Sequence, residues 1–189
     1  MFQHTNHEVY VATARSGDVL SGNIVTWALP GSLVPDAGRA VVVLSPLNFT
    51  HTLIRETGRF VLHLLAADQL DWLVRFGLSS GRDVDKFAGI PLGQTRSGLP
   101  VLPGTCGWVE MRIVDRLDSG DRIVYLCDAL EIGEEPARPV LHLKDAFARL
   151  PAEVVAALQE KKARDGDRDR AWLKDFGTPK PLRTIIDPP

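Results

Sequence analysis

The residues best suited to chemistry lie between Ser45 and Lys86. The stretch LSPLNFT ends an apolar run and supplies two hydroxyls and an amide, from Ser45, Asn48 and Thr50. A helix expected to start near Thr50 adds free backbone N–H groups and the positive end of its dipole. The later loop GLSSGRDVDKF adds two cations, Arg82 and Lys86. Donors and positive charge in one segment favour a site for an anionic ligand, such as a phosphate, without a P-loop.

A purely structural interpretation fits the same residues taken singly. Ser45 and Pro46 can form a turn with Asn48, and Thr50 can simply cap a helix. The order of the motifs along the chain decides between the two interpretations below.

The elements that must position these residues are mostly short strands. In chain order we expect strands at 9–13 and 19–27, a loop at 30–36, a strand covered on both faces at 39–44, a helix at 50–57 ended by Gly58, a strand at 60–65, a helix at 69–76 capped by Asp68 and closed by Gly77, an irregular crossing at 92–103, a hairpin of 106–116 with 122–132, and a short strand at 140–143. Many short strands with inserted helices are typical of a closed β-barrel rather than a βαβ sheet.

The character of the chain changes after about Phe147. We therefore divide it into a barrel domain at 1–146 and a C-terminal helix with a proline-rich arm at 147–189. A helix is expected at 151–163. The charged run at 161–170 is interpreted as a solvated surface segment, with docking to a partner as the alternative. The arm at 178–189 is expected to be extended.

Composition excludes several classes of function. The 189 residues carry a net charge of −2 with mixed signs, which argues against a nucleic-acid-binding surface. No signal peptide and no apolar run of membrane-spanning length is visible, so we expect a cytoplasmic protein. The histidines have no zinc-site spacing, and we predict no metal site. Pairing outward from the turn at 118–121 sets Cys127 opposite Arg112 and far from Cys106, so both thiols are expected to be reduced.

Three motifs in order carry a resemblance to a known family. SP-x-N-x-T is followed by an E-x-G-x-F strand and then by SGRDVDKF. With the flanking strands, the stretch from Val9 to Ile132 resembles the flavin reductase-like FMN-binding split-barrel proteins. The resemblance implies a mainly β split barrel with peripheral helices, a homodimer, and FMN in a cleft at the subunit contact. It places the flavin phosphate near Ser45, Pro46, Asn48, Thr50, Arg82 and Lys86.

The ring of the flavin is expected along the second strand and the loop after it. Thr26, Trp27 and Ser32 agree with the family pattern there, whereas Ser21 and Ile24 depart from it. A tryptophan in a strand is more often part of a core, so Trp27 alone decides little.

The hydride donor is where this chain departs most from the pattern. Relatives carry Gly-Asp-His at the turn of the last hairpin, and here the run is Gly120-Asp121-Arg122. An arginine stays cationic and cannot act as a neutral imidazole. We assign Arg122 to substrate binding, through attraction of a dinucleotide's phosphates. Cys127 stands where a glycine is usual.

The resemblance implies NAD(P)H-dependent flavin reduction, with NADH or NADPH as a transient donor. Reduced flavin or its electrons would then pass to a partner oxygenase or a small acceptor. No catalytic acid or base is expected, because N5 of the flavin accepts the hydride. One alternative is a flavin-carrying electron-transfer or sensing module without an efficient NAD(P)H site, and another is a member that has lost the flavin. The sequence leaves open FMN against FAD, and prosthetic group against passing substrate.

Overall fold

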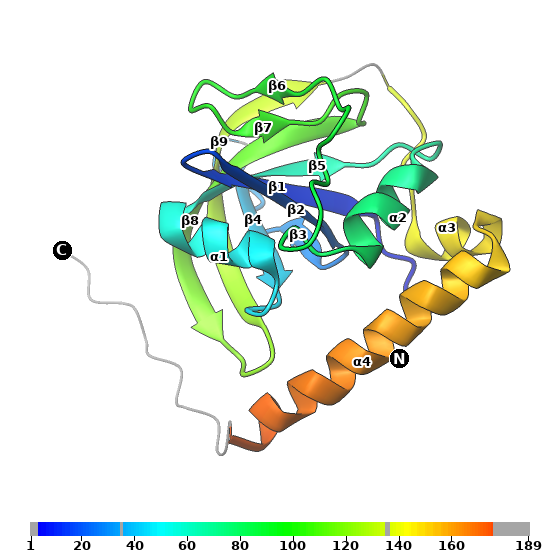
Figure 1. Ribbon diagram of the computed structural model, residues 1–189. Coiled ribbons are helices and arrows are strands. Elements are labelled where there is room, and N and C mark those ends of the chain that lie inside the picture. Colours follow the sequence, from blue (N-terminus) through cyan, green and yellow to red (C-terminus); the bar gives the residue numbers. More distant parts are fainter. Residues whose placement is uncertain (1–3, 35, 135–136, 176–189) are drawn as a thin grey trace.

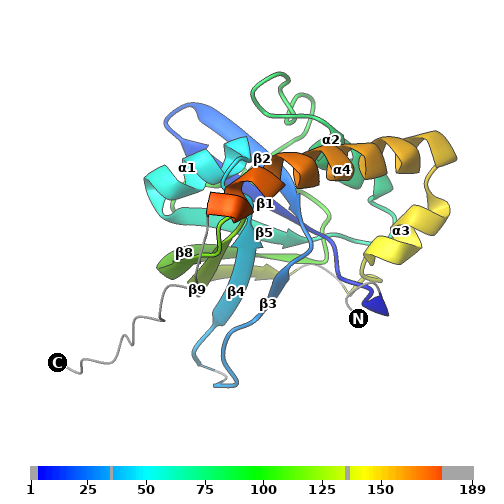
Figure 2. The same ribbon diagram turned by 90° about the horizontal axis from the view of Figure 1, so that it is seen from below.

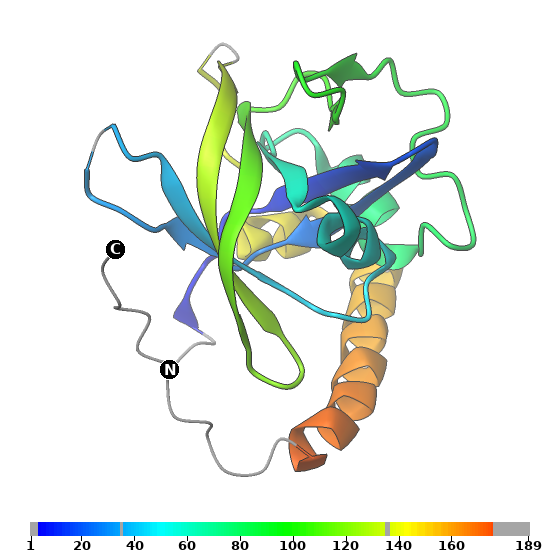
Figure 3. The same ribbon diagram turned by 90° about the vertical axis from the view of Figure 1, so that its left-hand side faces the viewer.

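A curled antiparallel sheet forms the centre of the molecule. The computed structural model describes residues 4–34, 36–134 and 137–175. The seven-stranded sheet has the order β2-β1-β5-β8-β9-β4-β3, and its curvature is clear in Figure 3. The strands are β1 (Tyr10–Ser16), β2 (Val19–Val25), β3 (Ala28–Pro30), β4 (Arg39–Leu44), β5 (Arg59–Leu64), β8 (Gly107–Asp118) and β9 (Ile123–Glu134). The mainly β split-barrel class is confirmed. In the described chain β2 and β3 each pair on one side only, so the expected full closure is wrong.

The helices lie outside this sheet (Figure 1). They are α1 (Phe49–Thr57), α2 (Leu70–Leu78), α3 (Leu143–Arg149) and α4 (Ala152–Asp175). Two short strands, β6 (Gly93–Gln94) and β7 (Pro100–Val101), pair within the segment expected to be an irregular crossing.

Local signals placed the first half of the chain well. β1 and β2 form the expected hairpin, whose turn contains Gly17 at a φ of 56°. The helix at α1 ends at Gly58 in the left-handed conformation, with a φ of 68°. β4 differs from the expectation of full cover on both faces, because fully buried residues alternate along it with partly buried ones.

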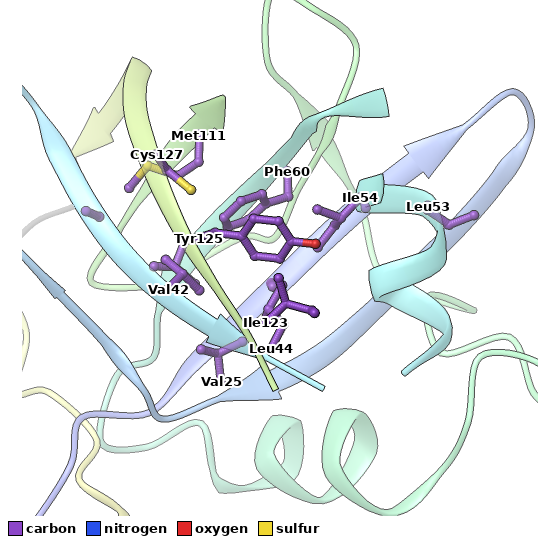
Figure 4. Close-up of a cluster of buried hydrophobic side chains, with 14 residues drawn as sticks. Val25, Val42, Leu44, Leu53, Ile54, Phe60, Met111, Ile123, Tyr125 and Cys127 are labelled. Atoms are coloured by element: carbon purple, nitrogen blue, oxygen red, sulfur yellow. The ribbon is translucent and has the colours of Figure 1, made fainter. Parts of the chain in front are cut away.

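Two apolar clusters fill the interior. In the first, Phe60 of β5 and Tyr125 of β9 lie at the centre, with Ile54 of α1 beside them (Figure 4). The Tyr125 hydroxyl also lies 2.6 Å from Nε2 of buried His51. The second cluster packs Phe76 of α2 and Phe87 against strands β1 and β2 and against α3.

The last hairpin differs from its predicted register by one residue. The turn is longer than predicted, because Asp118 pairs with Ile123 rather than with Asp121. The irregularity between Ile113 and Asp115 takes back one residue of this shift, so Cys127 lies opposite Ile113 instead of Arg112. Both cysteines lie in the described part of the chain and are free thiols. Burial raises the pKa of the Cys127 thiol to about 12, so it stays protonated.

The second helix begins and ends later than predicted. Asp68 does not cap α2, since the cap position is Gln69 and the Asp68 carboxylate pairs with Arg138 at 2.5 Å. Gly77 lies inside α2 instead of ending it. A Cβ added at Gly77 would lie 3.3 Å from Leu158 of α4. The glycine therefore lets α4 approach α2 closely.

The C-terminal region is more helical than predicted. The expected strand at 140–143 is reduced to two isolated bridges, Val140 with Ala66 and His142 with Glu8, and α3 begins at Leu143. α4 continues through the charged run at 161–170, where pairs such as Lys161–Asp165 join successive turns. α3 spans the domain boundary proposed at 146, and that division stays a prediction. The arm at 178–189 lies outside the described residues. Within the described ranges, no helix is long and apolar enough to cross a membrane.

Candidate functional site

A cavity of about 260 Å³ lies where β2, α1, α2 and α4 meet. Figure 2 shows α4 passing along α2, and three residues of α4 are among those that line the cavity. The lining residues are 22–24, 47–50, 76–77, 79–80, 82, 86, 161, 165 and 168. The cavity therefore collects four of the predicted site residues, Asn48, Thr50, Arg82 and Lys86, from separate elements.

The start of α1 faces this cavity. Asn48 is the N-cap residue of α1, and among the described residues its side chain makes no capping hydrogen bond. The first amides of a helix have no partner inside it, so they remain available to a ligand. Thr50 is buried, and its hydroxyl lies 2.8 Å from that of Ser21. Ser21 departs from the family pattern and here holds the Thr50 side chain in place.

Ser45 and Pro46 lie outside the cavity lining. The Asn48 amide donates to the Ser45 carbonyl at 3.2 Å, and the Leu47 amide to the Ser45 hydroxyl at 3.3 Å. These bonds form the turn at 45–48 that we expected if Ser45 and Pro46 have a structural role. The turn still acts on the site, because it sets the direction in which α1 begins.

The two predicted cations occupy different environments. Arg82 is exposed, and its guanidinium lies 5.1 Å from the Phe49 ring and donates to the Leu47 carbonyl. Lys86 is buried and donates to the carbonyls of Gly22 and Phe76, both at 3.0 Å. An ammonium has three N–H groups, so one remains for a ligand.

The pKa of Lys86 is lowered to about 8. Burial is the main cause, and the positive charge of Lys161 on α4 adds to it. Lys86 thus connects β2 to α2 through its two hydrogen bonds, and it is repelled by the positive charge of Lys161 on α4.

Several lining residues were not predicted from the sequence. Ser79 and Ser80 belong to the loop GLSSGRDVDKF, so their position beside Arg82 was a usable signal. Asn23 lines the cavity, and its side-chain oxygen is buried without a hydrogen-bond partner among the described residues. Such an oxygen costs about 1–3 kcal/mol unless a donor reaches it. The three α4 residues carried no local signal.

The residues assigned to the flavin ring are not part of this cavity. Thr26 and Trp27 connect β2 to β3, and the Trp27 carbonyl accepts from the Val43 amide. The Trp27 side chain is 48% exposed, which argues against a purely core role. Ser32 accepts from the Val34 amide at 3.0 Å in an exposed loop. The structure brings none of these three side chains into the cavity lining.

Arg122 lies against both Trp27 and α4. Its guanidinium carbon is 5.8 Å from the Trp27 ring. One guanidinium nitrogen lies 2.6 Å from Asp169 of α4, a residue that is only 3% exposed. Figure 3 shows the C-terminal half of α4 near the β8–β9 turn. Arg122 is therefore paired with the chain's own carboxylate.

Comparison with known proteins gives the family. A sequence model of the flavin reductase like domain matches residues 2–161, most of the chain. This chain belongs to the flavin reductase like domain family. The resemblance inferred from the motifs is thereby confirmed. The match ends at Lys161, so the later part of α4 lies beyond it.

Named relatives of this flavin reductase-like protein include larger proteins and a reductase subunit. A high molecular weight rubredoxin from Moorella thermoacetica is 30% identical over 126 residues, which cover 65% of this chain and 54% of that protein. The reductase subunit HsaB of a flavin-dependent monooxygenase from Mycobacterium tuberculosis is 29% identical and aligns with 53% of this chain and 54% of its own length. The chain thus spans about half of the length of these relatives.

A solved structure supports the fold. An FMN-binding protein from Thermus thermophilus matches with a TM-score of 0.65 at 24% identity, covering 71% of this chain and 74% of that one. At this identity the likeness concerns the fold.

Proposed function

We propose that this protein binds FMN and transfers electrons to it from NADH or NADPH. The observation that carries the proposal is the cavity at the start of α1, which joins free helix amides, the Ser79 and Ser80 hydroxyls and the cations Arg82 and Lys86. A phosphate monoester needs this combination of donors and positive charge.

The residues present also fit the rest of the flavin. The buried oxygen of Asn23 needs a donor, and the hydroxyls of a ribityl chain supply donors. The isoalloxazine ring would then lie along the end of β2, near Thr26 and Trp27. The half-exposed Trp27 side chain offers it an apolar wall. Ser32 and Pro46 would contribute by shaping the turns that carry the neighbouring backbone, at 32–34 and at 45–48. When bound, FMN supplies a hydride acceptor that can release electrons again.

The tasks of the protein are binding, orientation and exclusion of water. The α1 amides and the cations hold the phosphate, and Asn23 fixes the ribityl chain. Arg122 attracts the phosphates of the dinucleotide donor, which requires that it exchange its partner Asp169. No acid or base is assigned, because hydride transfer to the flavin needs none from the protein.

The electrons are proposed to pass to a partner oxygenase or a small acceptor. The name of HsaB, a reductase subunit of a monooxygenase, supports a partner of this kind. We also propose a homodimer with the cleft at its interface. Large apolar side chains are exposed on β9, on β3 and in the loop after it, as at Ile132 (65%), Leu29 (54%) and Leu33 (101%). A cytoplasmic location stays a prediction from the sequence.

A second function, a flavin carrier without an efficient NAD(P)H site, is favoured by the engagement of Arg122 with Asp169. An absorption spectrum recorded after FMN addition and desalting shows whether the protein retains the flavin. A titration with FMN, without a desalting step, detects weaker binding. Anaerobic mixing of the FMN-loaded protein with NADH or NADPH then separates the functions. Bleaching within seconds supports the reductase, and bleaching by dithionite alone supports the carrier. If the protein binds FMN in neither assay, both functions are overturned.

A further inference from the structure

The α4 wall of the cavity carries three charged side chains. Lys161, Asp165 and Arg168 line it from successive turns of the helix. Residues three and four apart share a helix face, so all three are presented to the same side. Asp165 and Arg168 lie beyond the region that the family match covers.

Asp165 joins the two cations. One of its oxygens lies 2.9 Å from the Lys161 ammonium, and the other lies 3.3 Å from the Arg168 guanidinium. The three side chains are between 31% and 45% exposed, so each remains reachable from solvent. The Asp165 carboxylate thus lies between an ammonium and a guanidinium, which are the two cationic groups that also bind phosphate oxygens.

Cations also face α4 from the opposite wall. Lys86 and Arg82 line the same cavity, and the charge of Lys161 contributes to lowering the pKa of Lys86. The ammonium groups therefore repel each other across the space between the walls. A dianion placed there interacts favourably with both walls, whereas Asp165 provides one negative charge from one side.

The helix that carries these cations is held in place at two points. Leu158 packs at Gly77 of α2. Further along, Arg168 bonds to Asp169 at 3.1 Å, and Asp169 in turn binds Arg122 at 2.6 Å. Arg168 is thus positioned by the fold, which lowers the entropy cost of using it for a ligand.

We propose that Lys161 and Arg168 bind the terminal phosphate of the flavin from the α4 side, and that Asp165 is the internal counter-ion which this phosphate replaces. The ligand class is a phosphate monoester. The inference rests on the proposed function, and it adds a phosphate-binding wall that lies mostly outside the family match.

The test compares FMN with riboflavin, which has the same ring and ribityl chain but no phosphate. Dissociation constants are measured by quenching of flavin fluorescence for the full-length protein and its variants. Lys161→Ala and Arg168→Ala should each weaken FMN binding about tenfold and change riboflavin binding less than twofold, because each removes one charge-assisted contact. Asp165→Asn should tighten FMN binding about threefold, because it removes the competing carboxylate.

Arg164→Ala is the matched control. Arg164 lies on the same helix, is 69% exposed and pairs with Glu160 away from the cavity lining, so its loss should leave both constants within twofold. Circular dichroism melting confirms that each variant is folded. Equal losses for FMN and riboflavin, or none for FMN, overturn the inference while the proposed function stands. Wild-type protein that binds neither flavin overturns the proposed function and this inference with it.

Discussion

The phosphate end and the donor end of the proposed flavin site are built from different kinds of contact. At the phosphate end, Lys86 is buried and held by two backbone carbonyls, and the start of α1 is fixed by a hydrogen-bonded turn. At the donor end, Arg122 lies beside half-exposed Trp27 and is held by the side chain of Asp169.

This difference separates a preformed site from an exchangeable one. Backbone carbonyls cannot leave without disrupting the fold, so Lys86 keeps its position whether or not a ligand is bound. Arg122 can exchange Asp169 for another anion, such as a phosphate of a dinucleotide, because the buried Asp169 carboxylate keeps its bond to Arg168. The comparison therefore predicts that changes at the phosphate end affect folding and flavin binding together, whereas changes at the donor end affect the donor most and reach flavin binding only through Asp169 and Arg168.

The largest effect is expected for Lys86→Met. The change leaves the carbonyls of Gly22 and Phe76 without their buried donor, which should lower the free energy of unfolding by about 3 kcal/mol. FMN binding by the folded protein should weaken by about 1–3 kcal/mol through loss of a charge-assisted contact. Urea unfolding and flavin titration measure the two effects. Unchanged values for both would remove Lys86 from the site and from the scaffold.

Raising the pH should separate folding from binding at the same residue. Because the pKa of Lys86 is about 8 in the folded protein, FMN affinity should fall about tenfold between pH 7 and pH 9 as the ammonium loses its proton. The unfolded chain holds this proton up to the ordinary pKa of 10.5. The free energy of unfolding should therefore rise between about pH 8 and pH 10.5. A pH-independent affinity in wild-type protein would contradict this; in Lys86→Met the drop should be absent.

Arg122→Ala tests the donor end. If Arg122 attracts the phosphates of the nicotinamide donor, the KM for NADH or NADPH should rise about tenfold. FMN affinity should fall less, by about threefold, because Arg122 holds Asp169, which bonds to Arg168. Asp169→Asn should lower the same KM, because it removes the competing carboxylate. Exposed Arg116 of β8 offers a control of equal charge. A rise in KM for both the Arg122 and Asp169 variants would show that their ion pair serves structure alone.

The smallest effect is expected for Asn23→Leu. Loss of one hydrogen bond to a ribityl hydroxyl should weaken FMN and riboflavin equally, about fivefold. Equal losses would distinguish this contact from the phosphate contacts, which riboflavin lacks. The stability should stay within about 1 kcal/mol of wild type, because the change removes a buried oxygen that has no partner among the described residues but also loses the bond from Asn23 Nδ2 to the Ile24 carbonyl. A loss restricted to FMN would place Asn23 at the phosphate instead.

Prediction from the sequence succeeded where the signals were local. The β1–β2 hairpin follows from its turn at Gly17, and the end of α1 follows from Gly58. Asn48, Thr50, Arg82 and Lys86 were assigned to one site from motif order, and they do line one cavity, although their role as flavin ligands stays a prediction. The register of the last hairpin failed because its turn is longer than predicted, with Asp118 opposite Ile123, and because no local signal marks the irregularity between Ile113 and Asp115.

The sequence by itself determined the family, the succession of short strands and the chemical groups at the start of α1, because each depends on residues close together in the chain. The tertiary structure decided what covers those groups. α4 contributes Lys161, Asp165 and Arg168 to a cavity whose other residues lie more than seventy positions earlier, and it pairs Asp169 with Arg122. Such contacts depend on how a charged helix docks against α2, where Gly77 admits Leu158. Helical periodicity fixes which residues share a face, but packing alone fixes what that face meets.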